Sequence, residues 1–459
     1  MTRRPNFIFL IADDHRARSL GASGCDAVTT PNLDALAARG TFYRNAHCQG
    51  GFDRAVCMPS RATLMTGRDV FALRRAQEAR KASSSETPPQ FLEIPSDMPT
   101  FPELLRAEGY RTHGVGKWHN DRDSFGRSFS SGSAIFFGGM CDHDKVPVTP
   151  FDPQGIFPSD TTSDMPGFST DLFSEAAKDF LRTQDGEEPF LLYTAFTAPH
   201  DPRTPPPAFM PNPDDIALPA DYLPLHPFDN GEAALRDELL EDYPRSPEAV
   251  RRHLAEYYGM IAHLDAAIGD ILATAEAQGL LENTVVVYTS DHGLGIGSHG
   301  LMGKQNLYEH SLGIPLILAG PGIEAGQQSD ALVWHGDTRA TVLDLAGITP
   351  PQDHGNLSLA AHAPTPQRDT FGAIYRMSQR MIRDARYKYV RYYPASANPA
   401  PDPIECTPGS ATEQLFDLNT DPFEQVNLAF APAQQDRRHA MAGALQQWQA
   451  AHGDALADS

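Results

Sequence analysis

A cysteine opens a short motif that could build a nucleophile, Cys57-Met58-Pro59-Ser60-Arg61. Pro59 fixes its φ angle and lacks an N–H, so it suits the first turn of a helix that Gly67 can end. Cys57 is therefore expected just before a helix N-terminus, where free N–H groups and the helix dipole favour a thiolate or an anion. Arg61, one turn further, could hold the cysteine-derived group. The alternative is a small buried cysteine beside a helix start, because free cysteine is among the most buried residue types.

Three aspartates and a histidine offer ligands for a divalent cation. Asp13 and Asp14 follow one apolar run of strand length, and Asp291 and His292 follow another. Carboxylate oxygens are hard ligands that suit Ca²⁺, Mg²⁺ or Mn²⁺, and His292 could add an imidazole nitrogen. Each acid could instead cap a helix or a turn. Repulsion between the adjacent carboxylates of Asp13 and Asp14 disfavours that alternative, since a cation would relieve it.

Two further lysines and two histidines supply positive charge and proton-transfer groups. Lys117 and His119 alternate on a short segment, His200 follows a strand end, and Lys304 follows the Gly-rich stretch 293–303. Alone, each would more often be a solvated loop residue. Beside three acids and a cysteine–arginine motif, they indicate a site for an anionic ester. A metal would polarise the ester oxygens, and the cations would stabilise charge in the transition state.

The elements that must position these residues are strands that alternate with helices. The predicted strands cover residues 6–12, 110–116, 190–196 and 284–289, and the helical patterns cover 32–39, 101–108, 172–182 and 251–278. Such alternation predicts an α/β fold with a large mostly parallel sheet sandwiched by helices. Ligands of such sheets bind outside the carboxyl ends of the strands. Polar residues at four strand ends therefore predict one shared crevice.

The pattern changes after about residue 360. Residues 1–360 are predicted to form the catalytic domain, and residues 366–459 a smaller C-terminal antiparallel sheet plus helix subdomain. The predicted elements of this subdomain are strands at 371–375, 380–383 and 387–393 and a helix at 435–451. Two segments rich in Pro, Gly or Ser, 125–167 and 201–230, follow motif residues and are candidates for the rim of a substrate pocket.

Composition narrows the class of protein. The chain of 459 residues has a formal net charge of −22, which disfavours nucleic acid as a partner. No apolar window is long enough to span a membrane. The cysteines are odd in number and show no zinc or disulfide spacing, which agrees with a reducing compartment. They are Cys25, Cys48, Cys57, Cys141 and Cys406. Because no secretory leader is evident, the expected location is cytoplasmic, or periplasmic if a leader was removed.

Taken together, these motifs resemble the type I sulfatases of the alkaline phosphatase superfamily, and the resemblance covers nearly the whole chain. The family's modification motif is matched by residues 57–68, and its Gly-Lys-Trp-His segment by residues 116–119. The other matching segments are 6–14, 198–200, 290–304, 314–318, 387–389 and 415–422. One departure concerns the metal site, because many members carry Asn where this chain has His292. Histidine is found there in other branches, including some sulfatases of sugar sulfates and some phosphonate or phosphodiester hydrolases.

The resemblance implies a formylglycine-dependent sulfatase. A formylglycine-generating enzyme would oxidise Cys57 to Cα-formylglycine, whose hydrate attacks the sulfur of a sulfate ester and releases the alcohol. Loss of a proton from the second hydroxyl then expels sulfate and restores the aldehyde. The resemblance assigns that second step to His119 beside Lys117, and stabilisation of the formylglycine to Arg61. His200 and Lys304 would grip the sulfate, and one of them would support the leaving oxygen.

For the cofactor, the resemblance implies one divalent cation, Ca²⁺ first with Mg²⁺ or Mn²⁺ as alternatives. Its ligands would be Asp13, Asp14, the residue derived from Cys57, Asp291 and His292. The substrate would be a small aryl or sugar sulfate, with no nucleic acid or membrane partner, and an oligomer is compatible with the sequence. One rival reading keeps the site and changes the substrate to a phosphonate monoester or phosphodiester. The other, a non-catalytic binding protein, is disfavoured because Asp13, Cys57 and Lys304 are all present.

Overall fold

A buried strand, β1 (Asn6–Ala12), lies at the centre of the largest sheet. The computed structural model describes residues 3–83, 92–350, 354–363, 365, 367–394 and 412–457. In these parts of the chain, eight strands form this sheet in the order β13-β2-β12-β10-β1-β9-β5-β6. The neighbours of β1 on both sides, and β5 and β6 beyond, are parallel, whereas β12 is antiparallel to β10 and β2. The predicted mostly parallel sheet is confirmed.

The strand bounds follow the apolar runs of the sequence. The other strands of this sheet are β2 (Thr41–Tyr43), β5 (Arg111–Lys117), β6 (Ser131–Phe136), β9 (Phe190–Ala195), β10 (Thr284–Ser290), β12 (Leu316–Ala319) and β13 (Gln327–Ser329). Strand β1 has the predicted bounds, β9 and β10 differ from prediction by one residue at one end, and β5 is shifted by one residue at both ends. Central strands that are buried on both faces carry continuous apolar runs, which is why these bounds were predictable.

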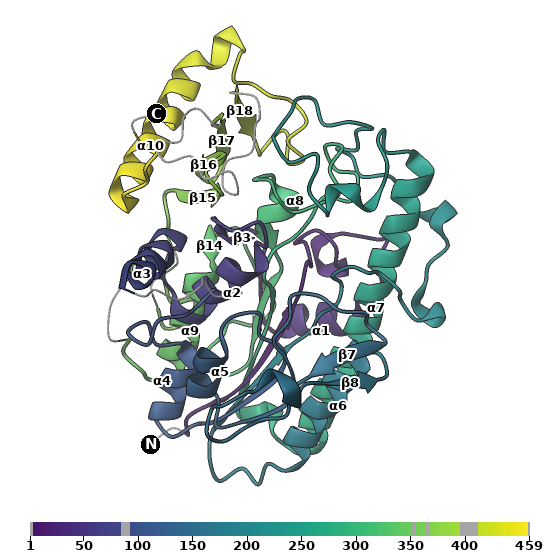
Figure 1. The fold of residues 1–459 in the computed structure, drawn as a ribbon, viewed down its shortest axis with the longest axis vertical. Coiled ribbons are helices and arrows are strands. Elements are labelled where there is room, and N and C mark those ends of the chain that lie inside the picture. The colour runs from purple at the N-terminus through teal and green to yellow at the C-terminus, as the bar shows by residue number, and fades with distance from the viewer. Residues whose placement is uncertain are drawn as a thin grey trace.

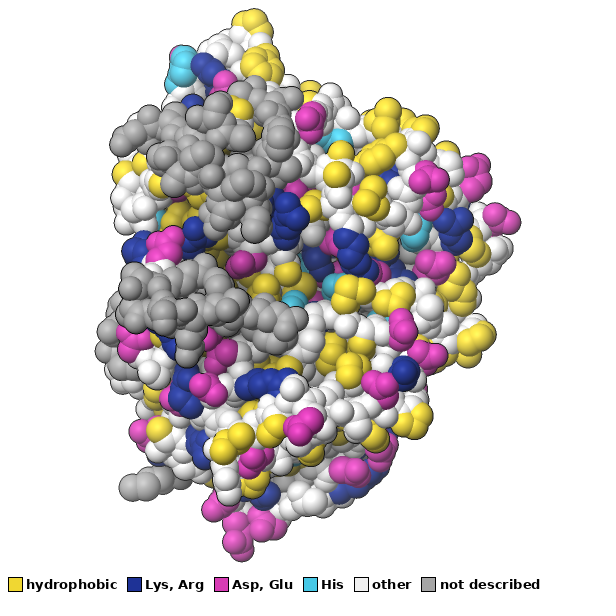
Figure 2. Space-filling model, viewed as in Figure 1, with side chains coloured by type: hydrophobic (Ala, Val, Ile, Leu, Met, Phe, Trp, Pro, Cys, Tyr) yellow, Lys and Arg dark blue, Asp and Glu magenta, His cyan; other side chains and the backbone are white. Residues whose placement is uncertain are grey.

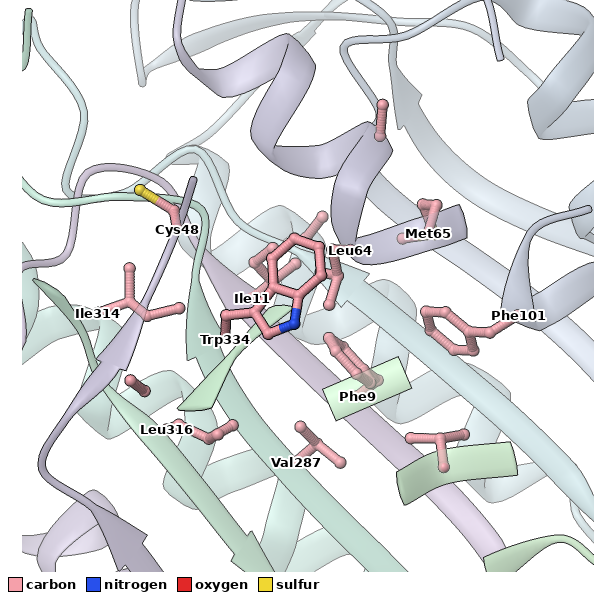
Figure 3. Packing of buried hydrophobic residues seen from close by; sticks show 14 of the residues in the cluster. Phe9, Ile11, Cys48, Leu64, Met65, Phe101, Val287, Ile314, Leu316 and Trp334 are labelled. Carbon is pink, nitrogen blue, oxygen red and sulfur yellow. The ribbon is translucent and has the colours of Figure 1, made fainter. Parts of the chain in front are cut away.

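Helices cover both faces of the sheet (Figure 1). Alternate residues of β1 point to opposite faces: Phe7, Phe9 and Ile11 join one hydrophobic cluster, and Ile8, Leu10 and Ala12 join another. The first cluster, part of which Figure 3 shows, includes side chains of α2 (Cys57–Thr66), α4 (Phe101–Ala107) and α9 (His335–Leu345). The second includes side chains of α1 (Pro31–Arg39), α6 (Ser169–Arg182) and α7 (Pro247–Ala277). Among the described residues up to 350, the remaining α-helices are α3 (Val70–Ser83), α5 (Arg122–Ser128) and α8 (Glu309–Leu312).

A second sheet of five strands has the order β18-β17-β16-β15-β4. The C-terminal strands β15 (Phe371–Tyr375), β16 (Gln379–Arg383), β17 (Tyr387–Tyr392) and β18 (Thr412–Asp417) are antiparallel, and α10 (Gln435–His452) packs on them. The predicted antiparallel sheet with a helix is therefore confirmed. Its fifth strand, β4 (Gly50–Gly51), pairs in parallel with β15 and comes from the N-terminal part of the chain. The domain bounds at 360 and 366 stay a prediction.

The remaining strands of the described residues form two further small sheets. They are β11-β3-β14, built from β11 (Gly313–Ile314), β3 (Ala46–His47) and β14 (Val333–Trp334), and the pair β7 (Lys145–Val148) with β8 (Ser163–Pro166). The segment 125–167 therefore holds β6, β7 and β8 and is less irregular than its composition suggested. Among the described residues, no helix is long and apolar enough to cross a membrane. Cys406 lies outside the described residues.

Candidate active site

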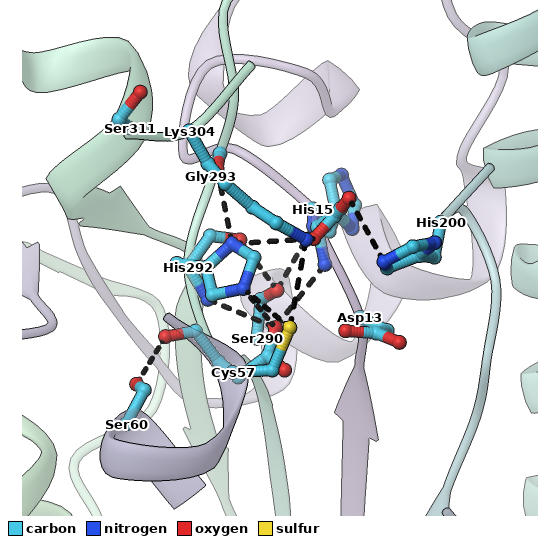
Figure 4. Close-up of polar contacts among 12 residues, drawn as sticks. Asp13, His15, Cys57, Ser60, His200, Ser290, His292, Gly293, Lys304 and Ser311 are labelled. Carbon is cyan, nitrogen blue, oxygen red and sulfur yellow. Dashed lines mark hydrogen bonds and ion pairs between the residues drawn. The ribbon is translucent and has the colours of Figure 1, made fainter. Parts of the chain in front are cut away.

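The carboxyl ends of four neighbouring strands carry most of the predicted site residues. In the sheet order β10-β1-β9-β5, these ends are followed by Asp291, Asp13, His200 and His119. Lys117 is the last residue of β5. Because parallel strands end at the same edge of a sheet, residues that are far apart in the sequence meet here, as predicted. Figure 4 shows Cys57, His292 and Lys304 pointing toward one another, with Asp13 and His200 beside them.

Helix α2 brings the cysteine to this edge. The helix begins at Cys57, with Val56 as its N-cap, and ends at Gly67, which has a left-handed φ of 67°. Cys57 thus occupies the first turn and does not precede the helix as predicted, because the helical hydrogen bonding already starts with the Ser60 N–H donated to the Val56 carbonyl (3.1 Å). The Cys57 Sγ lies 3.0 Å from His292 Nε2 and 3.5 Å from Lys304 Nζ.

The acids form a buried cluster that can hold a cation. Ligand atoms of Asp13, Asp14, Cys57 and His200 lie within 4.8 Å of one another, and so do those of Asp13, Cys57, Asp291 and His292. Asp14 has a φ of 73°, a strained conformation for a residue other than glycine. Its backbone is held there by two contacts: its N–H donates to Asp291 Oδ1 (3.1 Å) and its carbonyl accepts from the Tyr257 hydroxyl (2.7 Å).

Two cations balance part of this negative charge. The Arg61 side chain is buried, and its Nε donates to Asp291 Oδ2 at 3.0 Å while one terminal nitrogen lies 3.8 Å from Asp13 Oδ1. Its other terminal nitrogen donates to the Lys117 carbonyl (2.8 Å). The Lys117 Nζ donates to Asp13 Oδ2 and to the Gly139 carbonyl. Arg61 therefore ties α2 to the ends of β1, β5 and β10.

Charge and burial set the protonation of the cluster. Burial and the Asp291 carboxylate raise the pKa of Asp13, but Lys117 and the other nearby cations outweigh them, so this pKa lies below its ordinary value. Burial raises the pKa of Asp14, but His200 and Lys304 hold it below its ordinary value. The Asp291 pKa is lowered in the same way, with His292 and Arg61 overcoming burial. All three acids are thus carboxylates at neutral pH.

The two histidines beyond the acids differ in charge. Burial lowers the pKa of His200, but the Asp14 carboxylate outweighs it and raises that pKa to about 9. Burial and the neighbouring Lys117 hold the pKa of His119 well below its ordinary value. Burial lowers the pKa of Lys304 and Asp14 raises it, with a net rise well above the usual range. At neutral pH the site therefore contains cationic His200 and Lys304 and a neutral imidazole at His119.

Some contacts of the site gave no signal in the sequence. Gly139 supplies a carbonyl to Lys117, and a side chain at this position would begin 2.6 Å from His119 Nε2. Asp201 accepts a hydrogen bond from His200 Nδ1 through its carbonyl (2.7 Å). Contacts through backbone atoms do not depend on residue type, so no motif could have revealed the first. The second contact is also made by a backbone carbonyl, so residue types did not reveal it either.

The donors fit a hard divalent cation. Asp13 Oδ1 is buried and has no hydrogen-bond partner among the described residues, although it sits between carboxylates. A cation would supply the missing partner and relieve the repulsion between Asp13 and Asp291. Oxygen ligands from three carboxylates suit Ca²⁺ or Mg²⁺, and one imidazole is compatible with Mn²⁺ as well. Figure 2 shows Lys and Arg side chains near the middle of the drawn face, which provides local positive charge on a chain of net charge −22.

Comparisons with known proteins decide the family. The family model described as sulfatase matches residues 5–348. The chain belongs to the sulfatase family. A second model, described as the C-terminal part of N-sulphoglucosamine sulphohydrolase, matches residues 297–451. Membership makes this sulfatase a hydrolase of sulfuric esters and confirms the resemblance that the motifs of residues 57–68 and 116–119 had indicated.

Named relatives agree with this assignment, and a solved structure shares the fold. The sulfatase is 27% identical to N-acetylglucosamine-6-O-sulfatase of Bacteroides thetaiotaomicron over 426 residues, which cover 78% of this chain and 70% of the relative. It is 27% identical to arylsulfatase K of Canis lupus familiaris over 463 residues, covering 93% and 79%. The fold is similar to that of phosphonate monoester hydrolase of Agrobacterium radiobacter, with a TM-score of 0.72, 22% identity, and coverage of 98% and 96%.

Proposed function

We propose that this sulfatase cleaves a sulfate monoester of an aryl or sugar alcohol through a formylglycine derived from Cys57 and one divalent cation, Ca²⁺ in the first place. The observation that carries the proposal is the position of the Cys57 Sγ. It lies 3.0 Å from His292 Nε2 and 3.5 Å from Lys304 Nζ, at the edge of a buried carboxylate cluster. A buried structural cysteine would not need three ionised acids and two cations around it.

The cation would be held by Asp13, Asp14, Asp291 and His292, together with the residue formed from Cys57. When bound, it would polarise the sulfate oxygens and lower the pKa of the attacking hydroxyl. The formylglycine aldehyde would supply a hydroxyl nucleophile on hydration and a route for releasing sulfate without attack of water on sulfur. These two groups supply the reactive chemistry, and the side chains around them orient the ester and move protons.

His200 and Lys304 would bind the sulfate group of the ester. Both are cationic at neutral pH, and both lie at Asp14, with Lys304 Nζ 2.7 Å from Asp14 Oδ1 and His200 Nε2 3.9 Å from Asp14 Oδ2. Protonated His200 would also donate a proton to the leaving alcohol oxygen. His119, which is neutral, would accept the proton of the second hydroxyl when sulfate leaves. Arg61 would stabilise the formylglycine, because its guanidinium ties α2, which carries this residue, to the ends of the central strands.

Mass spectrometry of the tryptic peptide that contains residue 57 tests the nucleophile. Protein coexpressed with a formylglycine-generating enzyme should carry the aldehyde, and turnover of an aryl sulfate should rise in proportion to the converted fraction. Cys57→Ala, which cannot be converted, is the matched control and should show only background turnover. Unmodified thiol in a fully active preparation would refute the proposal.

A phosphonate monoester or phosphodiester is the second candidate substrate. It is favoured by His292 at the ligand position and by the fold similarity to a phosphonate monoester hydrolase. The two candidates are separated by measuring kcat/KM for a nitrophenyl sulfate and a nitrophenyl phenylphosphonate with the same converted enzyme. A higher kcat/KM for the phosphonate would replace our first choice. The cytoplasmic location and the oligomeric state stay predictions.

A further inference from the structure

Residues 236–238 contact both loops that carry the cationic site residues, although they lie beyond the predicted rim segment 201–230. Arg236 forms an ion pair with Asp201, the neighbour of His200. Glu238 contacts the loop that ends at Lys304, and Asp237 contacts Gln305, which directly follows this loop. This loop, residues 293–304, contains five glycines. Glycines provide no side chains to pack and leave the backbone free, so the loop needs outside contacts to hold one conformation.

Glu238 provides two such contacts. It begins a 3₁₀ turn, Glu238–Leu240, and its carboxylate is buried. Oε2 accepts a hydrogen bond from the Met302 N–H (3.0 Å), and Oε1 accepts one from the Gly303 N–H (2.9 Å). Gly303 directly precedes Lys304, so this carboxylate fixes the two peptide groups that aim the lysine.

The carboxylate of Glu238 is itself held in place. The buried Arg245 donates from one terminal nitrogen to Glu238 Oε2 at 2.8 Å and from the same nitrogen to the Glu238 carbonyl at 2.8 Å. A charged carboxylate bound by a guanidinium and two peptide N–H groups forms hydrogen bonds of the stronger, charge-assisted kind.

Asp237 supports the lysine by a second route. Its Oδ2 accepts from Gln305 Nε2 (2.7 Å), and Gln305 Oε1 accepts from the backbone N–H of Lys304 (3.0 Å). Hydrogen bonds to Glu238 thus hold the backbone just before Lys304, and a hydrogen bond to Gln305 holds the Lys304 N–H. From this backbone the Nζ reaches Asp14 at 2.7 Å and the Cys57 Sγ at 3.5 Å.

We propose that Glu238 is a positioning residue of this enzyme, which acts by fixing the Gly-rich loop and so placing the Lys304 ammonium at the reacting ester. The inference rests on the proposed function, in which Lys304 binds the sulfate group. A displacement of about 1 Å at a reacting centre can cost on the order of 100-fold in rate, so loss of the two loop hydrogen bonds is sufficient to impair catalysis without unfolding the site.

A double-mutant cycle tests this role. In Glu238→Gln, the amide keeps one acceptor oxygen, so one N–H bond survives and kcat/KM should fall about 10-fold; in Glu238→Ala, both bonds are lost and the fall should approach about 100-fold. Glu241→Gln is the matched control, because Glu241 lies in the same segment but its side chain accepts from Arg252 (2.5 Å), His253 (3.1 Å) and the Asp242 N–H (3.3 Å), none of which lies in the Gly-rich loop. Its kcat/KM should stay at the wild-type value.

The cycle then adds Lys304→Ala. If Glu238 acts through Lys304, Glu238→Gln should change kcat/KM by less than about 2-fold in the Lys304→Ala background, because residues that act as a unit are not additive. An equal 10-fold loss in both backgrounds would overturn the role of Glu238 and leave the proposed function intact. Full turnover by Lys304→Ala alone would overturn both. Glu238→Gln keeps the volume of the side chain, so the test does not depend on the folding of Glu238→Ala.

Discussion

Replacement of Arg61 by methionine should destabilise the folded protein far more than the loss of an ordinary surface ion pair. The Arg61 side chain is 1% exposed and contacts Asp291, Asp13 and the Lys117 carbonyl, as described above. Methionine fills a similar volume but leaves the buried carboxylates of Asp13 and Asp291 without this counter-charge. Removing one partner from a buried ion pair costs about 3–5 kcal/mol, since the remaining charge is neither solvated nor paired.

The expected shift in melting temperature follows from the size of the chain. The entropy of unfolding is about 2.1 cal/mol/K per residue, which for 459 residues is about 1 kcal/mol/K. Arg61→Met should therefore lower the melting temperature by about 3–5 °C in the presence of EDTA. Arg61→Lys should fall between wild type and Arg61→Met, because an ammonium retains the charge but lacks the planar fork that reaches three acceptors.

Arg44→Met is the matched control. Arg44 pairs with Asp330 at 2.5 Å, but the two side chains are 45% and 67% exposed. Pairs of this kind contribute about 0.2–1 kcal/mol, which corresponds to less than about 1 °C here. Differential scanning calorimetry of the three variants at one scan rate gives the melting temperatures that test this prediction. If Arg61→Met melted within 1 °C of Arg44→Met, the buried ion pairs of Arg61 would not contribute the expected free energy of unfolding.

Three further predictions concern the cation, the packing of His119 and the response to pH. Saturating Ca²⁺ at about 100 times its Kd should raise the melting temperature of EDTA-treated enzyme by about 3 °C and restore turnover. Asp13→Asn should abolish this rise. An unchanged melting temperature of the wild-type enzyme would contradict the cation site. Gly139→Ala should lower kcat at least about 10-fold, because its methyl group meets the His119 ring. The control Gly443→Ala, whose methyl group meets nothing within 4 Å, should leave kcat unchanged. Equal kcat values of the two variants would refute the steric argument. Burial lowers the pKa of His113 from 6.5 to about 4, so the unfolded chain takes up this proton first and stability falls as pH drops from 6.5 to 4. His113→Gln should reduce that slope by up to about 1.4 kcal/mol per pH unit in chemical denaturation, and an unchanged slope would show that His113 does not contribute.

The local pattern of apolar residues was enough to predict the central strands that carry the site. The run 6–12 is apolar at every position but the first, ends at two aspartates, and has the bounds of β1. The run 284–289 predicts β10 to within one residue, because the strand extends to Ser290. Burial on both faces leaves no room for polar residues within such strands, so their ends are visible as abrupt changes in polarity. The two-residue strand β4 has no periodicity, and its pairing with β15 was not predictable.

The candidate site was predictable in its residues but not in its contacts. Parallel strands share one carboxyl edge, which is why the sequence alone predicts that Asp13, His119, His200 and Asp291 lie together. The contact between Cys57 and His292 spans 235 residues and depends on where α2 packs over the sheet. Residue types alone also could not show that His119 is neutral while His200 is cationic, because that difference arises from burial and from distances to Asp14 and Lys117.

By itself, the sequence determined the class of fold, the family and the inventory of reactive side chains, since these depend on local polarity and on residue identity at motif positions. Only the tertiary structure decided how the inventory is arranged. It put the Cys57 Sγ against His292 and Lys304, left Asp13 Oδ1 without a hydrogen-bond partner among the described residues, and placed Glu238 against the loop that carries Lys304. Such arrangements depend on packing between distant segments and on backbone hydrogen bonds, which leave no pattern of residue types in the chain.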